Sequence, residues 1–302
     1  MTSSSIFRPC FPLASVFEFS FYTIQTMFTR IILIMISLNL FSGCQTVRRT
    51  FRSDLQQHFQ NHRSGTDLLQ VEDISHLPAP VQRYLHHCGF VGHERITNAR
   101  VVWADSHIRM KPGGRWMRLR TEQYNSVDSP FRIAYMKARL LGLIPFEGRD
   151  LYARGHGHMY GRIGKLIKVF DEKDPAIAQS ALVIVLAEAL LVPGYALSEY
   201  IRWEAVDDTT ARATISHEGV EATGTFFFND LVEMLRFETR ERYYMDPEQG
   251  NVPRAFVAYV GDYRKQGSLV IPGSLHAVWR LESGDYEYWK GSIEAVQYNI
   301  SS

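Results

Sequence analysis

The segment from Asp174 to Val192 is apolar on every side, and it constrains the fold of this chain more than any other feature. Asp174 is a good N-cap, and Pro175 suits the first helical position, where its missing N–H costs nothing. Pro193-Gly194 then stops the helix. A helix without a polar face is either buried or in a membrane. Its unbroken apolar run reaches about half of the roughly 20 residues that a bilayer span needs. We therefore expect a core helix that lies against a large curved sheet.

Glu188 is a single carboxylate on this otherwise apolar helix. A carboxylate in such surroundings needs a hydrogen-bond donor or a cation, or else it stays protonated. Arg149, Arg240 and Arg242 are candidate counter-ions for it. Two interpretations of these arginines remain open. They form an exposed charged strand face, or they face inward and bind Glu188 or the head group of a ligand.

Before and after this helix, apolar residues alternate with a period of two, which is typical of half-buried strands. Between residues 131 and 136, for example, one face carries Phe131, Ile133 and Tyr135 and the other carries Arg132, Ala134 and Met136. Turn signals separate about a dozen such strands into a meander. The pattern predicts a β-rich α+β fold, in which a single large curved antiparallel sheet, a half-barrel, wraps around the buried apolar helix. Short helices near Ser53–Gln60 and Pro80 precede the sheet.

The sequence from Met27 has the organisation of a short secretion signal rather than of a spanning helix. Arg30 supplies the positive charge, the apolar region runs from Ile31 to Leu40, and Phe41-Ser42-Gly43-Cys44 follows. This ending resembles a bacterial lipobox, although its phenylalanine stands where leucine is commoner. The resemblance implies that Cys44 is cleaved to the new N-terminus and carries acyl chains. The alternative is an uncleaved N-terminal anchor.

These features predict four parts of the chain: residues 1–26 upstream of the true translation start, a signal peptide at 27–43, a lipid-anchored tether at 44–75, and a ligand-binding half-barrel domain at 76–302. By analogy with Gram-negative lipoproteins, Gln45 favours the outer membrane. We therefore expect a lipoprotein of the bacterial cell envelope that faces the periplasm. Cys88 is the remaining cysteine of the mature domain, so an internal disulfide is excluded, and we expect it to be a small buried residue.

Composition and motifs argue against several classes of function. The net charge is +1, whereas nucleic-acid-binding proteins normally carry a basic surplus. The chain lacks the G-x-S-x-G, P-loop, H-E-x-x-H and C-x-x-C signatures. His156 and His158 project from one face of a strand, as zinc or copper ligands do, but a third ligand is missing. Glycines at 155 and 157 more often mark a close backbone approach. We predict no metal and no cofactor.

Three segments resemble a bacterial family of unknown function: LPAPVQRYL at 77–85, GRDLYARGHGHM at 148–159 and GDYRKQGSLVIPGSLHAVW at 261–279. The resemblance covers roughly residues 75–299 and implies no activity. The expected layout is also similar to the half-barrels of periplasmic lipoprotein carriers and their outer-membrane receptors. In those proteins a curved sheet and a helical lid enclose an acyl-binding cavity.

Three hypotheses for the function follow. The first is a monomeric, lipid-anchored protein that binds a hydrophobic small molecule or lipid in the half-barrel, with Glu188 as its polar handle. Tyr135, Trp203, Arg149 and Arg240 are the other candidate ligand-binding residues. The second is a hydrolase or isomerase of an apolar substrate, with Glu188 as general acid–base. The third is a scaffold with a filled core. A cavity separates the first two from the third, and polar groups that converge on Glu188 favour the second over the first.

Overall fold

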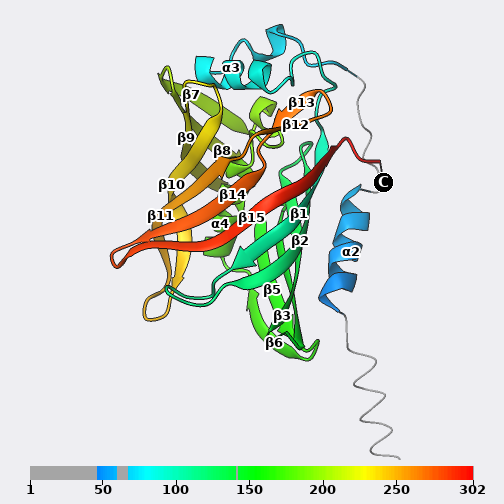
Figure 1. The fold of residues 1–302 in the computed structure, drawn as a ribbon, viewed down its shortest axis with the longest axis vertical. Coiled ribbons are helices and arrows are strands. Elements are labelled where there is room, and N and C mark those ends of the chain that lie inside the picture. The colour runs from blue at the N-terminus through cyan, green and yellow to red at the C-terminus, as the bar shows by residue number, and fades with distance from the viewer. Residues whose placement is uncertain (1–45, 60–66, 141, 302) are drawn as a thin grey trace, which may run out of the picture. The chain divides into compact units, whose positions relative to one another are not determined.

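Thirteen antiparallel strands form one curled half-barrel sheet in the computed structural model, which describes residues 46–59, 67–140 and 142–301 (Figure 1). The first six strands are β1 (Asn98–Ile108), β2 (Met117–Ser126), β3 (Phe131–Leu140), β4 (Ile144–Ala153), β5 (His156–Ile163) and β6 (Ile167–Glu172). The others are β7 (Ile201–Asp207), β8 (Thr210–His217), β9 (Val220–Phe228), β10 (Met234–Asp246), β11 (Gly250–Gly261), β14 (Ser274–Leu281) and β15 (Gly284–Tyr298). The expected fold class is confirmed.

The strand order is β6-β5-β4-β3-β2-β1-β15-β14-β11-β10-β9-β8-β7. Two meanders are therefore joined where β1 pairs with β15, with Ala99 opposite Tyr298. A separate hairpin of β12 (Arg264–Gln266) and β13 (Leu269–Ile271) interrupts the second meander. Strands β6 and β7 lie at the two edges of the sheet, so the helix that connects them in sequence has to pass between the edges.

This connecting helix, α4 (Pro175–Ala187), lies inside the curl of the sheet and contacts β4, β5, β8, β9 and β10 (Figure 1). The Asp174 side chain caps it by accepting a hydrogen bond of 2.9 Å from Ile177 N. The expected end at Val192 is wrong. Glu188 leaves helical geometry, with φ −89° and ψ 4°, and the chain continues as a buried turn. The apolar composition extends through this turn, and composition does not distinguish a buried turn from a buried helix.

Gly157 lets β5 approach the backbone of α4. A Cβ atom at this position would lie only 2.5 Å from Ile177 O. A Cβ atom at Gly155, in the turn before β5, would lie 2.6 Å from Glu218 Cβ, and its φ of +72° also favours glycine. The interpretation of these glycines as positions of close approach is confirmed.

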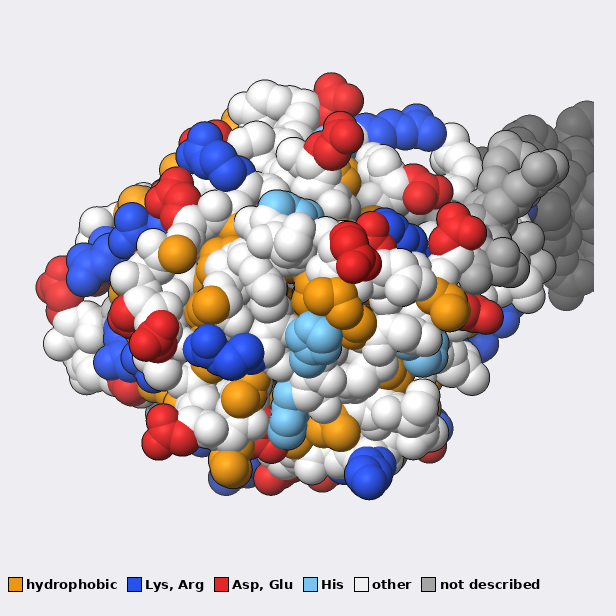
Figure 2. All heavy atoms as spheres, turned by 90° about the horizontal axis from the view of Figure 1, so that it is seen from above, with side chains coloured by type: hydrophobic (Ala, Val, Ile, Leu, Met, Phe, Trp, Pro, Cys, Tyr) orange, Lys and Arg blue, Asp and Glu red, His pale blue; other side chains and the backbone are white. Residues whose placement is uncertain are grey.

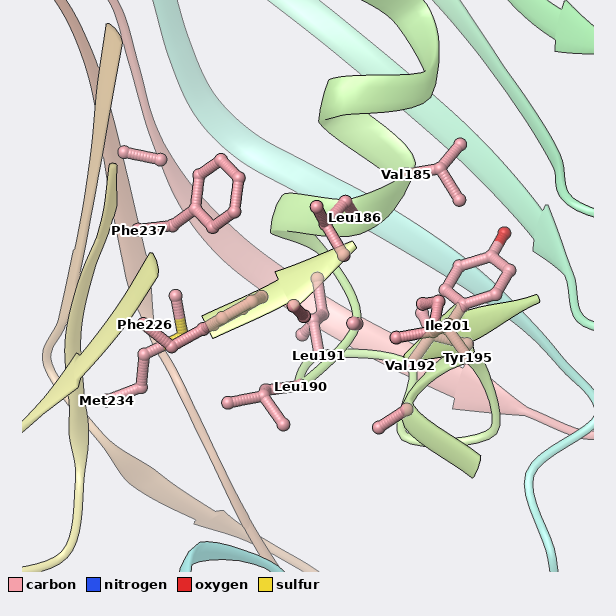
Figure 3. Close-up of a cluster of buried hydrophobic side chains, with 14 of the residues drawn as sticks. Val185, Leu186, Leu190, Leu191, Val192, Tyr195, Ile201, Phe226, Met234 and Phe237 are labelled. Atoms are coloured by element: carbon pink, nitrogen blue, oxygen red, sulfur yellow. The ribbon is translucent and has the colours of Figure 1, made fainter. Parts of the chain in front are cut away.

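The main hydrophobic core lies around the end of α4 and the turn that follows (Figure 3). Leu186 and Leu190 pack near Phe226 and Phe237 of the second meander. Tyr195 is fully buried, and its hydroxyl donates a hydrogen bond of 2.7 Å to Phe131 O at the start of β3. The turn after α4 thus ties the two meanders together and fixes the position of Glu188 within the half-barrel.

Two further helices pack against the half-barrel, one on the outer face of the sheet and one across its end. Helix α2 (Val47–Phe59) packs its buried side chains onto the outward-facing residues of β3. Helix α3 (Ala79–His87) begins close to Pro80, as expected, and its Tyr84 ring lies 5.9 Å from the Phe228 ring. Figure 2 views the end of the domain on which α3 lies and shows acidic and basic side chains intermixed there, with histidines near the middle.

Candidate functional site

The Glu188 carboxylate is the centre of a buried polar network on the inner face of the sheet. Gln123 Nε2 and Asn125 Nδ2, both from β2, each donate a hydrogen bond of 2.8 Å to Glu188 Oε2. Arg132 Nε, from β3, donates one of 2.9 Å to Oε1. Asn125 and Arg132 are directly opposite each other in the β2–β3 register, so both side chains reach the same point. Glu188 is 6% exposed, and its two carboxylate oxygens accept hydrogen bonds from these three side chains.

Arg132 joins Glu188 to a second carboxylate. Its Nη1 donates a hydrogen bond of 2.8 Å to Asp150 Oδ2, and its Nη2 donates one of 3.2 Å to Gln123 Oε1. Burial alone would lower the pKa of Arg132, but the charges of Glu188 and Asp150 outweigh burial and raise it. Two carboxylates therefore share one guanidinium, which leaves Arg132 no charge to offer to a ligand.

An apolar cavity of about 190 Å³ lies beside this network. Its wall contains four methionines, Met110, Met117, Met136 and Met159, and six aromatic residues, Trp103, Phe146, Phe170, Phe256, Tyr288 and Trp289. For comparison, an engineered apolar cavity of about 150 Å³ holds benzene. Methionine side chains adapt to ligands of different shape, because they are unbranched and polarisable. The cavity can therefore hold a small apolar molecule or a segment of a hydrocarbon chain.

Arg242 of β10 belongs to the same cavity wall and is surrounded by aromatic rings. Its guanidinium carbon lies 4.3 Å from the centroid of Phe256, 4.8 Å from that of Trp279 and 5.4 Å from that of Tyr288. Its Nη1 donates a hydrogen bond of 2.7 Å to the Tyr288 hydroxyl. Cation–π contacts hold the guanidinium in place without neutralising it.

The charge of Arg242 is unpaired within the described part of the chain, where no carboxylate lies within ion-pair distance of it. Its Nε is buried and has no hydrogen-bond partner there, and the same is true of Trp103 Nε1 in the cavity wall. A guanidinium beside apolar space is suited to bind the carboxylate or phosphate of an amphiphilic ligand. Arg132 and Arg242 therefore differ in role: the first is neutralised and the second is available.

Of the candidate ligand-binding residues, only Glu188 lines this cavity. Tyr135 lies on the outer face of β3, where its ring stacks on Phe51 of α2 at 5.2 Å. Arg149 lies under the same helix, with its Nη2 2.5 Å from Asp54 Oδ2. The structure does not bring either residue to the cavity, because α2 covers the outer face of the sheet there.

The other two candidates also lie away from the cavity. Trp203 packs against Phe226 at 5.0 Å and donates a hydrogen bond of 2.9 Å to Ala196 O, so it belongs to the core. Arg240 is exposed on β10, two residues from Arg242. Cys44 lies outside the described residues.

The sequence did not reveal four members of the network around Glu188, namely Arg132, Gln123, Asn125 and Asp150. A signal for Arg132 was present, since alternation places it on one face with Ala134 and Met136, which also line the cavity. No comparable signal marks Gln123 or Asn125. Their role depends on the register of β2 against β3.

Both ring nitrogens of His158 lie within hydrogen-bond distance of described side chains. Its Nε2 lies 2.8 Å from Asp171 Oδ1, and its Nδ1 lies 3.0 Å from Arg149 Nη1. Within the described residues, no three His, Cys, Asp or Glu side chains are grouped so that they could hold a metal ion.

Cys88 is buried, and burial raises the pKa of its thiol to about 12. The expectation of a small buried residue is confirmed.

The described part of the chain also contains no helix of sufficient length and apolar character to cross a membrane.

Fold and cavity together define a half-barrel domain with an internal apolar site. The chain belongs to a family of unknown function, DUF6544, whose model matches residues 67–291. No curated protein matches it. Among solved structures it is similar to a LolA superfamily protein from Nitrosomonas europaea, at 10% identity over 74% of this chain and 94% of that chain, with a TM-score of 0.39. It is also similar to a DUF1329 family protein from Desulfovibrio piger, at 10% identity over 75% of this chain and 95% of that chain, with a TM-score of 0.42.

Proposed function

We propose that this protein is a lipid-anchored protein of the bacterial cell envelope that binds a hydrophobic molecule in its half-barrel cavity. The observation that carries this proposal is the apolar cavity of about 190 Å³ with the unpaired Arg242 in its wall. Apolar clefts with a few convergent polar groups are the usual sites of small-molecule binding. A scaffold with a filled core would have no need of such a space.

The ligand that suits this wall is an amphiphile with one apolar chain and one acidic group. Methionine and aromatic side chains contact the chain, and the acidic group binds Arg242 and the Tyr288 hydroxyl. Glu188 holds the Arg132 guanidinium in place in the cavity wall. This arrangement favours an acyl chain with a carboxylate or phosphate head group over an uncharged hydrocarbon.

The location follows from the sequence before the domain. The signal-like segment 27–43 and the lipobox-like residues that end at Cys44 support lipidation of that cysteine, and Gln45 supports the outer membrane, with the domain in the periplasm. The protein acts as a monomer, without metal or cofactor, and has no nucleic-acid partner.

The convergence of polar groups on Glu188 supports a second candidate, a hydrolase or isomerase of an apolar substrate. In this candidate Glu188 exchanges a proton with the substrate at the cavity wall. Its weakness is that Glu188 already accepts three hydrogen bonds from protein donors, and these would have to be broken first.

Native mass spectrometry of the full chain, released from detergent micelles, tests the binding function. We expect a fraction of the protein to carry an additional mass that denaturation removes and that corresponds to an acidic amphiphile. Protein that is free of bound mass, and that also takes up no added fatty acid or phospholipid, would contradict the proposal. A ligand that appears in chemically altered form after incubation would favour the second candidate.

A further inference from the structure

A second hollow, on the outer face of the sheet, is strongly basic. This groove is lined by seven cationic side chains, Arg48, Arg115, Arg118, Arg120, Lys137, Arg139 and Lys165, and by one carboxylate, Glu147. All seven cationic residues are exposed. Because the whole chain carries a net charge of only +1, this surplus is a local segregation of charge. The groove therefore presents a concentrated positive field on one part of the surface.

Three arginines of the groove have no carboxylate partner among the residues that the structure describes. Arg118 forms an ion pair of 3.1 Å with Asp105. For Arg115, Arg120 and Arg139, no carboxylate lies within ion-pair distance in the part of the chain that the structure describes. The one carboxylate of the groove, Glu147, accepts a hydrogen bond of 2.6 Å from the Tyr135 hydroxyl. The charges of Arg115, Arg120 and Arg139 are thus available to an external anion.

The turns beside this groove expose large apolar side chains. Leu143 is 79% exposed in the turn between β3 and β4, and Leu166 is 71% exposed in the turn between β5 and β6. Ile167, the first residue of β6, is 66% exposed. Both turns lie at the lower end of the sheet in Figure 1. Gly164 and Lys165 both have positive φ, which makes the second turn tight and projects Leu166 away from the sheet. Exposed leucines on turn tips have no role in the packing of this domain.

Trp116 adds an interfacial residue to the groove. It lies between two further cations, with the Arg109 guanidinium 4.0 Å and the Lys290 ammonium 4.7 Å from its ring. Cationic side chains with apolar turn tips and a partly exposed tryptophan match the two layers of a membrane surface, the anionic head groups and the acyl boundary beneath them.

The chain also enters the described domain at this groove. Thr46, the first described residue, lines it together with Arg48. Cys44, the residue proposed to carry the lipid, is two positions earlier in the sequence. A lipid on Cys44, as proposed above, would be separated from Thr46 by one residue of the chain. Met117, Leu119 and Phe146 line both the groove and the ligand cavity, so the cavity wall reaches the same part of the domain.

We propose that the groove and the β3–β4 and β5–β6 turns form a docking face for a membrane surface rich in anionic lipid. The cations bind head groups, and Leu143, Leu166 and Ile167 insert into the acyl boundary. The docking face orients the half-barrel so that the Met117 side of the cavity is next to the bilayer. This inference goes beyond the proposed function and uses the lipid anchor only as support, since the charges and the apolar tips carry it alone.

Vesicle binding of the full chain with Cys44→Ser tests the inference without the acyl chains, and the apolar segment 31–40 is present in every variant that is compared. We expect tighter binding to vesicles rich in phosphatidylglycerol than to phosphatidylcholine vesicles, by at least about tenfold, because each cation near an anionic surface contributes about fivefold. The preference should decrease as salt is added. The double variant Arg120→Glu and Arg139→Glu should reduce this preference at least about tenfold. The double variant Leu143→Ser and Leu166→Ser should weaken binding to both kinds of vesicle.

The matched control is Arg202→Glu with Arg212→Glu, two exposed arginines on β7 and β8, which should retain the preference. Melting temperatures should be unchanged in all variants, because every substituted side chain is exposed. Equal behaviour of the groove variant and the control would overturn the inference. So would a lipid preference that depends on the arginines but not on the leucines, since it would indicate a site for a soluble polyanion. Fatty-acid labelling of Cys44 is a separate measurement, so failure of the anchor and failure of the docking face are distinguishable.

Discussion

At the scale of single residues, the cavity wall contains two arginines with different electrostatic surroundings. Arg132 is bonded to Glu188 and Asp150, whereas Arg242 is held by aromatic rings and the Tyr288 hydroxyl. The network around Glu188 holds Arg132 in position, and the proposed ligand-binding charge is that of Arg242. This division makes separate predictions for stability and for binding.

We expect Glu188→Gln to destabilise the protein by about 3 kcal/mol, at the lower end of the range for a broken buried ion pair, because Asp150 still binds Arg132. The new amide also places N–H donors against Gln123 or Asn125, which are donors themselves. Chemical denaturation measures the free energy of unfolding. Glu238→Gln breaks the half-exposed pair with Arg236 and is the control, which should cost no more than about 1 kcal/mol.

A double-mutant cycle with Arg132→Met separates the pair from its surroundings. We expect the double variant to lose less stability than the sum of the two single variants, by at least about 1 kcal/mol, since the interaction between Glu188 and Arg132 is lost only once in the double variant but is counted twice in the sum. Additive losses, or a loss below about 0.5 kcal/mol for Glu188→Gln alone, would show that the contact is not energetically coupled.

At the scale of elements, β3 illustrates what the sequence predicts and what it does not. The alternation of Phe131, Ile133 and Tyr135 against Arg132, Ala134 and Met136 is confirmed by the structure. The alternation alone does not say which face is inside, because α2 covers the outer face and both faces are buried. For this reason Tyr135 was expected in the cavity, and Arg132 was not recognised as the counter-ion of Glu188.

The contact between α4 and β5 gives a test at the same scale. Gly157→Ala places a Cβ atom 2.5 Å from Ile177 O if nothing moves, so the helix and the strand must separate. We expect a loss of about 2 kcal/mol in the free energy of unfolding, as for overpacking of a core. In Gly261→Ala the nearest atom, Ser274 Oγ, lies at 3.6 Å, and this control should stay within about 0.5 kcal/mol of the wild type. Equal effects would show that the close approach has no energetic consequence.

At the scale of the whole molecule, the half-barrel around one apolar helix was predictable, because period-two strands on both sides of residues 174–192 leave few other arrangements. The cavity was not predictable. Its volume depends on how the side chains of many strands pack, and residues such as Met136 and Phe256 read as ordinary core residues in the sequence. The clustering of cations in the groove could not be predicted for a similar reason, since these residues come from α2 and from several strands and turns.

The anchor is also a property of the whole molecule, since it determines where the domain works. Metabolic labelling with a fatty-acid analogue should label the wild-type chain, and Cys44→Ser should accumulate as an unlabelled precursor. Cys88→Ser is the control and should keep the label, because that thiol is buried. Label on the Cys44→Ser protein would show that acylation occurs elsewhere or that the lipobox-like sequence has another role.

Photo-crosslinking with a diazirine fatty acid tests the central claim, ligand binding in the half-barrel, most directly. In the full chain we expect crosslinks on cavity residues such as Met117 and Met136. Ala134→Phe, which fills the cavity, should abolish them, whereas Ala205→Phe on the exposed face of β7 should not. Arg242→Met should weaken labelling by the fatty acid at least about tenfold and labelling by the matching fatty alcohol far less, because only the acid needs the charge. Crosslinks that fall outside the cavity, or that persist unchanged in Ala134→Phe, would contradict the account.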